Sequence, residues 1–339
     1  MDEGLFPSLE QAFRCHIHGV KPRRNVYFVK TNRGLWVVKG YSDRIKAEWV
    51  TQLAHQLRER GFHQTVQYMS DIQGQTVFPY NGQFYTIMKA IEGREANNSS
   101  LYDVKKSATA LARFHLAAQG FPTPQGLTCY RPSIMDKWET RLQQFDQIVA
   151  KLKKREPQNR IEQTIQLMVK EVKRDADQVM EQMYKIPLFS EMERAIELGT
   201  MAHRDVASHN FLIAPTGNCF LIDLDTVDND MQLVDLVQLM GRMLLLQEYN
   251  FDSFMEAIDA YHKVKPLSDT QIWMVFQMLR YPDNVLREVT GVYYKRPGYS
   301  ARGVTELLQM ERKLRHARRA FLQSEQRIFQ RIGPYTYVG

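Results

Sequence analysis

The sequence predicts an α+β protein of two lobes, a small antiparallel β lobe with one helix and a larger, mainly helical lobe. The first ninety residues contain short β-type runs separated by turn signals. From residue 98 onward, apolar residues recur mostly at helical spacing. We therefore expect a β-rich N-terminal lobe over residues 1–90 and a helical C-terminal lobe over residues 91–339, with the boundary near Lys89–Glu95.

The predicted strands are short runs of β-branched and aromatic residues, at Val26–Thr31, Leu35–Gly40, Thr65–Met69, Phe78–Tyr80 and Gln83–Met88. Asn81-Gly82, between the last two runs, is a strong hairpin signal. One helix interrupts the strands, because Val50, Leu53 and Leu57 recur at helical spacing before Gly61. We expect a sheet of about five strands with one inserted helix.

The second lobe begins at Ser100 and Asp103, which resemble a capping box. Two long apolar stripes before and after Pro157 predict a helical hairpin inserted near residues 134–186. A short β interlude is expected next, at Phe211–Ala214 and Cys219–Ile222. Further helices are predicted at Leu233–Leu246, Phe251–His262, Thr270–Arg280 and Val304–Ile328.

The composition is that of an ordinary globular protein, with 44% apolar and 24% charged residues. No run approaches the roughly 20 apolar residues that cross a bilayer, and the N-terminus lacks a secretory signal pattern. Cys15, Cys129 and Cys219 are few and far apart, which argues against a disulfide framework or a clustered zinc site. We expect synthesis in the cytoplasm and no membrane partner.

The net charge of +7 raises the possibility of nucleic-acid binding. Much of the basic excess lies in helical stretches such as Lys151–Arg155 and Arg312–Arg319. Solvated helix faces explain such runs more simply, so a nucleic-acid partner is not expected. A modest positive field also favours an anionic ligand such as a nucleotide.

The strongest chemical signal is the segment from His203 to Asn210, followed by Asp223 at the end of the β interlude. Phosphoryl transfer needs oxygen ligands for magnesium and a carboxylate beside the attacking hydroxyl. Asp205 suits the carboxylate role, and Asn210 and Asp223 suit the metal. The simpler alternative is a polar turn whose Asp and Asn side chains cap nearby backbone.

Lys39 is the second signal, because it stands in an apolar strand, where an unpaired ammonium is costly to bury. It needs an anionic partner, and phosphate oxygens or a carboxylate would serve. Glu48, early in the following helix, is the natural candidate. The alternative is an edge-strand lysine whose amine reaches water.

A third segment, Phe84–Ile91 followed by Glu92-Gly93-Arg94, reads as a strand that becomes a connector. Its backbone groups could hydrogen-bond an adenine edge, with Met88 behind the base. An ordinary strand end is the alternative.

Together these residues resemble the protein-kinase-like superfamily, and within it the aminoglycoside phosphotransferase and choline kinase branch. The resemblance implies a two-lobed kinase-like fold that binds ATP, or another nucleoside triphosphate, with Mg²⁺. It implies phosphate contacts for Lys39, a pairing role for Glu48, and a hinge that includes Met88, Lys89 and Ile91. In the second lobe it implies Asp205 as the catalytic carboxylate, Asn210 and Asp223 as metal ligands, and Asp235 as a structural support for the catalytic loop. Ala110–His115 looks like the helix of that family that ends in Leu-x-x-x-His.

Within that branch, the chain is most similar to the CotS and YutH group of spore-coat kinase-like proteins. The features are the length, the helical hairpin, and the segment from Tyr281 to Tyr294. This similarity implies association with the spore coat and with other coat proteins.

Two positions depart from the family pattern. No Gly-x-Gly-x-x-Gly precedes Lys39, since Lys21–Tyr27 stands in its place. The residues after Asp223 are Leu224 and Asp225, so Asp225 either assists the site or is a polar turn residue.

Two functions remain open. The first is an active kinase that phosphorylates a hydroxyl of a small molecule, a sugar or phosphorylated metabolite rather than a cationic aminoglycoside, although a protein hydroxyl is not excluded. The second is a kinase-like structural component of the spore coat with little or no turnover.

Overall fold

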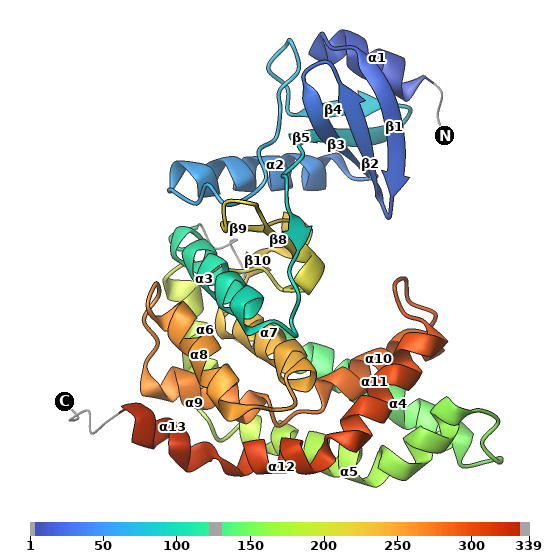
Figure 1. Cartoon of the computed structure of the whole chain (residues 1–339), viewed down its shortest axis with the longest axis vertical. Helices are drawn as coiled ribbons and strands as arrows, with labels where there is room; N and C mark the ends of the chain where they lie inside the picture. The colour runs from blue at the N-terminus through green and yellow to red at the C-terminus, as the bar shows by residue number, and fades with distance from the viewer. Residues whose placement is uncertain (1–3, 122–130, 333–339) are drawn as a thin grey trace. The chain divides into compact units, whose positions relative to one another are not determined.

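The computed structural model describes residues 4–121 and 131–332, which form two compact units (Figure 1). The first unit comprises Met1–Ala96 and Ser208–Val227, and the second comprises Asn97–Ala207 and Asp228–Gly339. Cys15 and Cys219 are free thiols, and Cys129 lies outside the described residues. Over the two described ranges, no helix is both long and apolar enough to span a bilayer.

The sheet of the first unit is antiparallel, and its described strands follow the order β1-β2-β3-β5-β4. These are β1 (Ile17–Arg23), β2 (Val26–Thr31), β3 (Gly34–Tyr41), β4 (Val77–Tyr80) and β5 (Gln83–Lys89). The hairpin at Asn81-Gly82 is confirmed, with φ of 46° and 74° at the two residues, as a tight β-hairpin turn requires.

The N-terminal helix α1 (Leu5–Phe13) and strand β1 were not predicted. Strand β1 contains Gly19 and Pro22 and is mostly exposed, so it lacks an apolar alternation. A proline is tolerated there because β1 is an edge strand. The predicted strand at Thr65–Met69 is wrong, because this segment forms only an isolated bridge between Tyr68 and Met88.

Two helices of the first unit pack against the sheet (Figure 1). Leu5, Leu9 and Phe13 of α1 form one core with Trp36 and Val38 of β3. Helix α2 (Arg44–Glu59) is the inserted helix that the sequence predicted. The Asp43 side chain accepts from the Ile45 N–H at its start. Because side chains alternate along a strand, Lys39 lies on the face of β3 opposite to Trp36 and Val38.

The predicted boundary at residue 90 differs from the division in the structure. Strand β6 (Arg94–Glu95) pairs with β8 (Phe211–Ile213), which pairs with β9 (Cys219–Leu221). In addition, the Leu221 N–H donates to the Gln64 carbonyl at 2.9 Å. These contacts attach Ser208–Val227 to the first unit, although we had assigned everything after residue 90 to the second.

The second unit is mainly helical. Its described helices are α3 (Leu101–Ala117), α4 (Ser133–Leu152), α5 (Arg160–Met183), α6 (Leu188–Glu197), α7 (Leu233–Leu246), α8 (Phe251–His262), α9 (Asp269–Met278), α10 (Asp283–Tyr293), α11 (Ala301–Lys313), α12 (Arg315–Gln323) and α13 (Glu325–Ile332). Two short strands, β7 (Met201–Ala202) and β10 (Asp228–Asn229), pair with each other.

Most helices follow the prediction. The bounds of α7 and α8 match it, the Ser100 side chain caps α3, and α4 packs against α5 as the expected hairpin. The helix predicted over Val304–Ile328 is divided into α11, α12 and α13, with breaks at Leu314 and Ser324. Helices α6 and α10 were not predicted, because each is short and follows a proline.

Gly199 ends α6 in a Schellman motif. Its N–H donates to the Ile196 carbonyl, and the Thr200 N–H donates to the Ala195 carbonyl. Its φ is +56°, and a Cβ at this position would lie 2.1 Å from the Phe121 carbonyl oxygen. Gly120 also has a positive φ, +66°, but a Cβ there would meet nothing within 4 Å. Gly199 therefore combines a left-handed backbone with a close backbone approach just before β7.

We predict that Gly199→Ala lowers the free energy of unfolding by roughly 3 kcal/mol or more, because it adds a backbone clash to the strain of a positive φ. Gly120→Ala is the matched control and should cost only about 1 kcal/mol, the strain alone. Chemical denaturation of both variants measures the difference. Equal losses in the two would contradict the packing described here.

Candidate active site

Lys39 lies at the centre of an ion cluster in the first unit. Its Nζ is 2.7 Å from Asp223 Oδ1 and 2.9 Å from Asp225 Oδ2. Lys39 is only 7% exposed, whereas both carboxylates are partly open to solvent. The cluster brings together a β3 residue and two residues that follow β9, about 184 positions later in the chain. The expectation that this lysine needs an anionic partner is confirmed.

Burial by itself lowers the pKa of the Lys39 ammonium. The attraction and hydrogen bonds of Asp223 and Asp225 outweigh it, so the pKa of Lys39 is raised above its ordinary value. Lys39 is therefore fully charged at neutral pH, and it holds a positive charge against two carboxylates in a largely buried position.

Two tyrosines complete the cluster. The Tyr41 hydroxyl donates to Asp225 Oδ1 at 2.9 Å, and Lys39 Nζ lies 5.6 Å from the centre of the Tyr41 ring. Burial raises the pKa of Tyr41 and of Tyr68, and Asp225 raises both further. Both hydroxyls therefore stay protonated. The sequence analysis did not single out Tyr41, although its position two residues after Lys39 places it on the same face of β3.

The expected ion pair between Glu48 and Lys39 is not the one found in the structure. Glu48 Oε1 accepts from Arg44 Nε at 2.7 Å, one helical turn earlier on α2, and both side chains are half exposed or more. Lys39 is paired by Asp223 and Asp225 instead. The prediction considered only the nearest carboxylate in the sequence, whereas tertiary folding brings two others to the ammonium.

Asn210 and Asp223 lie on adjacent segments of the first unit. Asn210 ends the short helix η1 (Ser208–Asn210) and is 2% exposed. Its carbonyl accepts from the Ile222 N–H at 2.9 Å, which holds the Asn210 backbone next to the residue before Asp223. Asp223 has φ of 63° and ψ of 72°, a left-handed conformation that non-glycine residues rarely adopt. Such outliers concentrate at functional sites.

The chemistry of these side chains fits magnesium. Mg²⁺ is commonly bound through one or two protein carboxylates together with substrate phosphates. Asp223 supplies a carboxylate and Asn210 an amide oxygen. Within residues 4–121 and 131–332, no group of three or more His, Cys, Asp and Glu could hold a metal ion by itself. A site of this kind would thus depend on phosphate oxygens for part of its coordination.

The predicted hinge residues lie at and after the end of β5. Met88 is 8% exposed and bridges to Tyr68. The Lys89 N–H donates to the Gln67 carbonyl at 3.3 Å, and the Ala90 N–H donates to the Leu35 carbonyl at 2.9 Å. These two N–H groups are engaged within the protein. Ile91, the last of the three predicted hinge residues, is half-buried. The adenine contact of Met88, Lys89 and Ile91 stays a prediction.

In the second unit, Asp235 holds the backbone of the predicted catalytic loop. The side chain is fully buried at the start of α7. Its two oxygens accept from the N–H groups of His203, at 2.6 Å, and Arg204, at 2.7 Å. Arg204 has a left-handed φ of 66°. The supporting role that the resemblance implied for Asp235 is confirmed.

His115 is the third partner of Asp235. Its Nε2 lies 2.9 Å from Asp235 Oδ2, and its Nδ1 lies 2.7 Å from the Tyr261 hydroxyl. Burial lowers the pKa of His115, whereas hydrogen bonds and charge lower the pKa of Asp235 despite its burial. The ring is therefore neutral, donates from Nε2 to the carboxylate and accepts at Nδ1 from Tyr261. His115 thus acts through Asp235 as a positioning residue.

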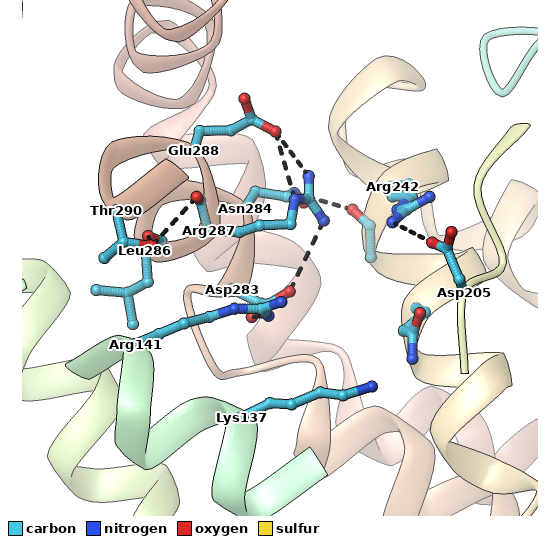
Figure 2. A network of polar contacts seen from close by, with 12 residues as sticks. Lys137, Arg141, Asp205, Arg242, Asp283, Asn284, Leu286, Arg287, Glu288 and Thr290 are labelled. Carbon is cyan, nitrogen blue, oxygen red and sulfur yellow. Dashed lines mark hydrogen bonds and ion pairs between the residues drawn. The ribbon is translucent and has the colours of Figure 1, made fainter. Parts of the chain in front are cut away.

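Asp205 follows this anchored backbone. Its side chain is 43% exposed, and Arg242 Nη2 lies 3.6 Å from its Oδ1 (Figure 2). The Arg204 carbonyl just before it accepts from Lys137 Nζ at 3.4 Å and from Gln238 Nε2 at 3.3 Å. Asp205 is thus a partly exposed carboxylate that follows a backbone held by side chains of α4 and α7.

The structure therefore gathers Lys39, Asn210 and Asp223 within the first unit, together with Asp225. Asp205 belongs to the second unit, three residues before the chain enters the first at Ser208. Glu48 and the hinge residues belong to the first unit as well.

We predict that the buried neutral His115 makes the protein less stable in mild acid. Below about pH 6.5 the unfolded chain protonates this histidine while the folded chain does not, so the unfolded state binds more protons. The free energy of unfolding should fall by up to about 1.4 kcal/mol per pH unit. Urea denaturation from pH 7.5 to 5.5 measures this slope.

In His115→Gln the slope should become shallower, although the variant is less stable at every pH. His316→Gln, at an exposed position of α12 in the same unit, is the control and should keep the slope. An unchanged slope in His115→Gln would contradict a buried neutral ring.

The chain is similar to several solved kinases. For an aminoglycoside phosphotransferase from Alicyclobacillus acidocaldarius, the identity is 18% over 97% of both chains, with a TM-score of 0.83. A spectinomycin phosphotransferase bound to AMP is 13% identical, and the match covers 98% of this chain and 95% of that chain with a TM-score of 0.61. An amicoumacin kinase in complex with AMP-PNP and Ca²⁺ is 12% identical over 92% of both chains, with a TM-score of 0.58. These likenesses show the two-lobed kinase-like α+β fold. Residues 19–267 match the family model described as phosphotransferase enzyme family. The chain belongs to this phosphotransferase family.

Proposed function

We propose that this protein is an ATP-dependent phosphotransferase that transfers the γ-phosphoryl group to a hydroxyl of a small molecule. The observation that carries the proposal is the cluster of Lys39, Asp223 and Asp225, with Asn210 on the adjacent segment. A partly buried lysine beside carboxylate and amide oxygens offers what a metal-bound polyphosphate needs. Family membership and the nucleotides bound by the spectinomycin phosphotransferase and the amicoumacin kinase support the choice of donor.

Each residue then has a defined role. Lys39 binds phosphate oxygens, Asn210 and Asp223 hold Mg²⁺, and Asp205 orients the acceptor hydroxyl and accepts its proton. Met88, Lys89 and Ile91 border the adenine. A bound Mg²⁺ would neutralise charge on the phosphates. Catalysis comes mostly from positioning and electrostatic stabilisation, because the chain supplies no nucleophile in this scheme.

The ion cluster suggests how Lys39 changes partner. Asp223 Oδ1 accepts from the Lys39 ammonium, so Asp223 would have to release Lys39 in order to hold a metal ion through this oxygen. The Lys39 ammonium would then be available to phosphate oxygens, with Asp225 as its remaining carboxylate partner. Glu48 can join this arrangement only by leaving Arg44. That exposed ion pair is worth about 0–1 kcal/mol, so little opposes the exchange.

A second candidate is a kinase-like structural component with little or no turnover. The observation in its favour is the β1–β2 turn, which carries Arg24 where a glycine-rich loop would cover the phosphates. Arg23 in this hairpin pairs with Glu95 at 2.8 Å.

On the resemblance to the CotS and YutH group, we also propose association with the spore coat and other coat proteins. Fractionation of spores from the source organism tests this, and absence from the coat extract would remove it.

We predict that ATP with Mg²⁺ raises the melting temperature of the wild-type protein and that Asp223→Asn abolishes the Mg²⁺-dependent part of this rise. Ligand at 100 times its Kd stabilises by about 2.7 kcal/mol, which is readily measured as a thermal shift. Asp177→Asn, at an exposed position of α5, is the control and should behave as wild type. If millimolar ATP and Mg²⁺ do not stabilise the wild-type protein, the enzyme hypothesis is wrong. The result would then favour a structural role with little or no turnover.

We predict that Asp205→Asn leaves ATP binding intact but reduces phosphoryl transfer by about 10²–10⁴-fold, the usual contribution of a positioned acid–base group. Wild type and variant are each incubated with ATP and a metabolite extract, and the phosphorylated products are compared by mass spectrometry. Equal product formation by both proteins would exclude Asp205 from catalysis.

A further inference from the structure

A cavity of about 160 Å³ opens beside Asp205 in the helical unit. Its wall is formed by α4, α7 and α10, together with the catalytic loop and parts of α11 and α12. Figure 2 shows Lys137 and Arg141 extending from α4, the polar residues of α10 beside them, and Arg242 next to Asp205. Pockets for drug-sized ligands measure roughly 300–1,000 Å³. This cavity is smaller and suits a small metabolite.

The cavity wall carries more positive than negative charge. Six of its side chains are basic and three are acidic, namely Lys137, Arg141, Arg204, Arg242, Arg287 and Arg318 against Asp205, Asp283 and Glu311. Burial also raises the pKa of the Glu311 carboxyl. The cavity beside the catalytic carboxylate is therefore electropositive.

Part of this charge is compensated within the protein. Asp283 is shared between Arg141, which binds it directly, and Arg287, whose Nη1 lies 3.7 Å from Oδ2. Arg204 Nη1 pairs with Asp228 at 2.7 Å, and Arg318 Nη1 pairs with Asp175 at 2.7 Å. Four of the six basic residues of the cavity wall are therefore paired with carboxylates of the protein itself.

Lys137, like Arg242, is not in one of these pairs. It is half-buried on α4, and its Nζ donates to the Arg204 carbonyl at a long 3.4 Å. No carboxylate of residues 4–121 or 131–332 lies within ion-pair distance, 4.0 Å, of this ammonium. Burial lowers the pKa of Lys137, and the nearby Arg204 lowers it further. A partly buried ammonium without a paired carboxylate is costly unless an anion meets it.

Among the residues that the structure describes, Arg242 has no ion-pair partner closer than Asp205. Its guanidinium is 3.6 Å from Asp205, a long contact with the very carboxylate that the reaction uses. Burial and the neighbouring Arg287 lower the pKa of Arg242 to about 10, so it still carries its charge at neutral pH. Lys137 and Arg242 therefore present two basic side chains at the cavity wall next to Asp205.

We propose that the acceptor of this phosphotransferase is a small anionic hydroxyl compound, whose phosphate or carboxylate group binds Lys137 and Arg242 while its hydroxyl lies at Asp205. The inference rests on the proposed function and names its substrate class. A cationic acceptor would meet like charges in this cavity. An anion satisfies both groups, and charge-assisted hydrogen bonds to it are about twice as strong as neutral ones.

The reaction is then the transfer of the γ-phosphoryl group from ATP, an anion, to the hydroxyl of a second anion. The hydroxyl oxygen forms a bond to the γ-phosphorus of ATP, and the bond from that phosphorus to the β,γ-bridging oxygen breaks. ADP leaves with the electron pair of the broken bond. Asp205 accepts the hydroxyl proton and releases it to solvent. The positive cavity wall offsets the repulsion between the acceptor anion and the triphosphate.

The test compares matched three-carbon probes that differ in charge: glycerol 3-phosphate, glycerate, glycerol and 3-amino-1,2-propanediol. Isothermal titration at low salt measures their binding to the full chain saturated with a nonhydrolysable ATP analogue and Mg²⁺, so that the probes cannot occupy the nucleotide site. We expect an anionic probe to bind at least about tenfold more tightly than glycerol, and the amine to bind more weakly than glycerol. The phosphate and carboxylate arms identify which anionic group the cavity prefers.

Lys137→Gln should weaken binding of the anionic probe about tenfold, the loss expected for one charge-assisted contact. Lys151→Gln, at an exposed position of the same helix, should not change it. Melting temperatures without ligand confirm that both variants are folded. Equal affinities for the anion and the amine, or an unchanged affinity in Lys137→Gln, would overturn the inference. Failure of the ATP analogue to bind would instead count against the proposed function, so the two failures are distinguishable.

Discussion

The buried carboxylate of Asp235 is the interaction on which the backbone leading to Asp205 depends. It accepts from two consecutive backbone N–H groups, those of His203 and Arg204, and from the neutral ring of His115. A buried charge of this kind is tolerated only when donors surround it. The donors come from the His203–Arg204 backbone and from α3, so the hydrogen bonds that stabilise the charge also hold this backbone in place. The left-handed residue Arg204 lies between this anchor and Asp205.

Each unit stabilises one buried charge by surrounding it with polar partners, and the two charges are of opposite sign. In the helical unit a buried anion is stabilised by N–H donors, whereas in the sheet unit the buried cation Lys39 is stabilised by two carboxylates. The first arrangement is saturated and structural. The second exposes its carboxylates in part, and Asp223 adopts a rare backbone conformation. A site that exchanges partners during a reaction needs the second kind, which is why the ion cluster, rather than the Asp235 network, is assigned to ligand binding.

The sequence predicted the regular elements well, because their signals are local. Helices α7 and α8 follow from apolar periodicity, and the β4–β5 hairpin follows from Asn81-Gly82. Some local elements, namely α1, α6 and α10, were not predicted. The misses that concern the candidate site arise from tertiary structure. The partner of Lys39 lies 184 residues away, so the nearby Glu48 seemed the better candidate. Strand β1 carries no apolar alternation, and the return of Ser208–Val227 to the sheet unit depends on pairing between β6 and β8, which are two and three residues long. The basic cavity wall likewise gathers side chains from helices far apart in the sequence.

A crystal structure of the full chain with a nonhydrolysable ATP analogue and Mg²⁺ tests the central claim most directly. The account predicts a magnesium ion bound by Asn210 and Asp223, the Lys39 ammonium on phosphate oxygens, and the Asp205 carboxylate facing the γ-phosphorus. A nucleotide bound away from Lys39, or a metal held without Asp223, would contradict it.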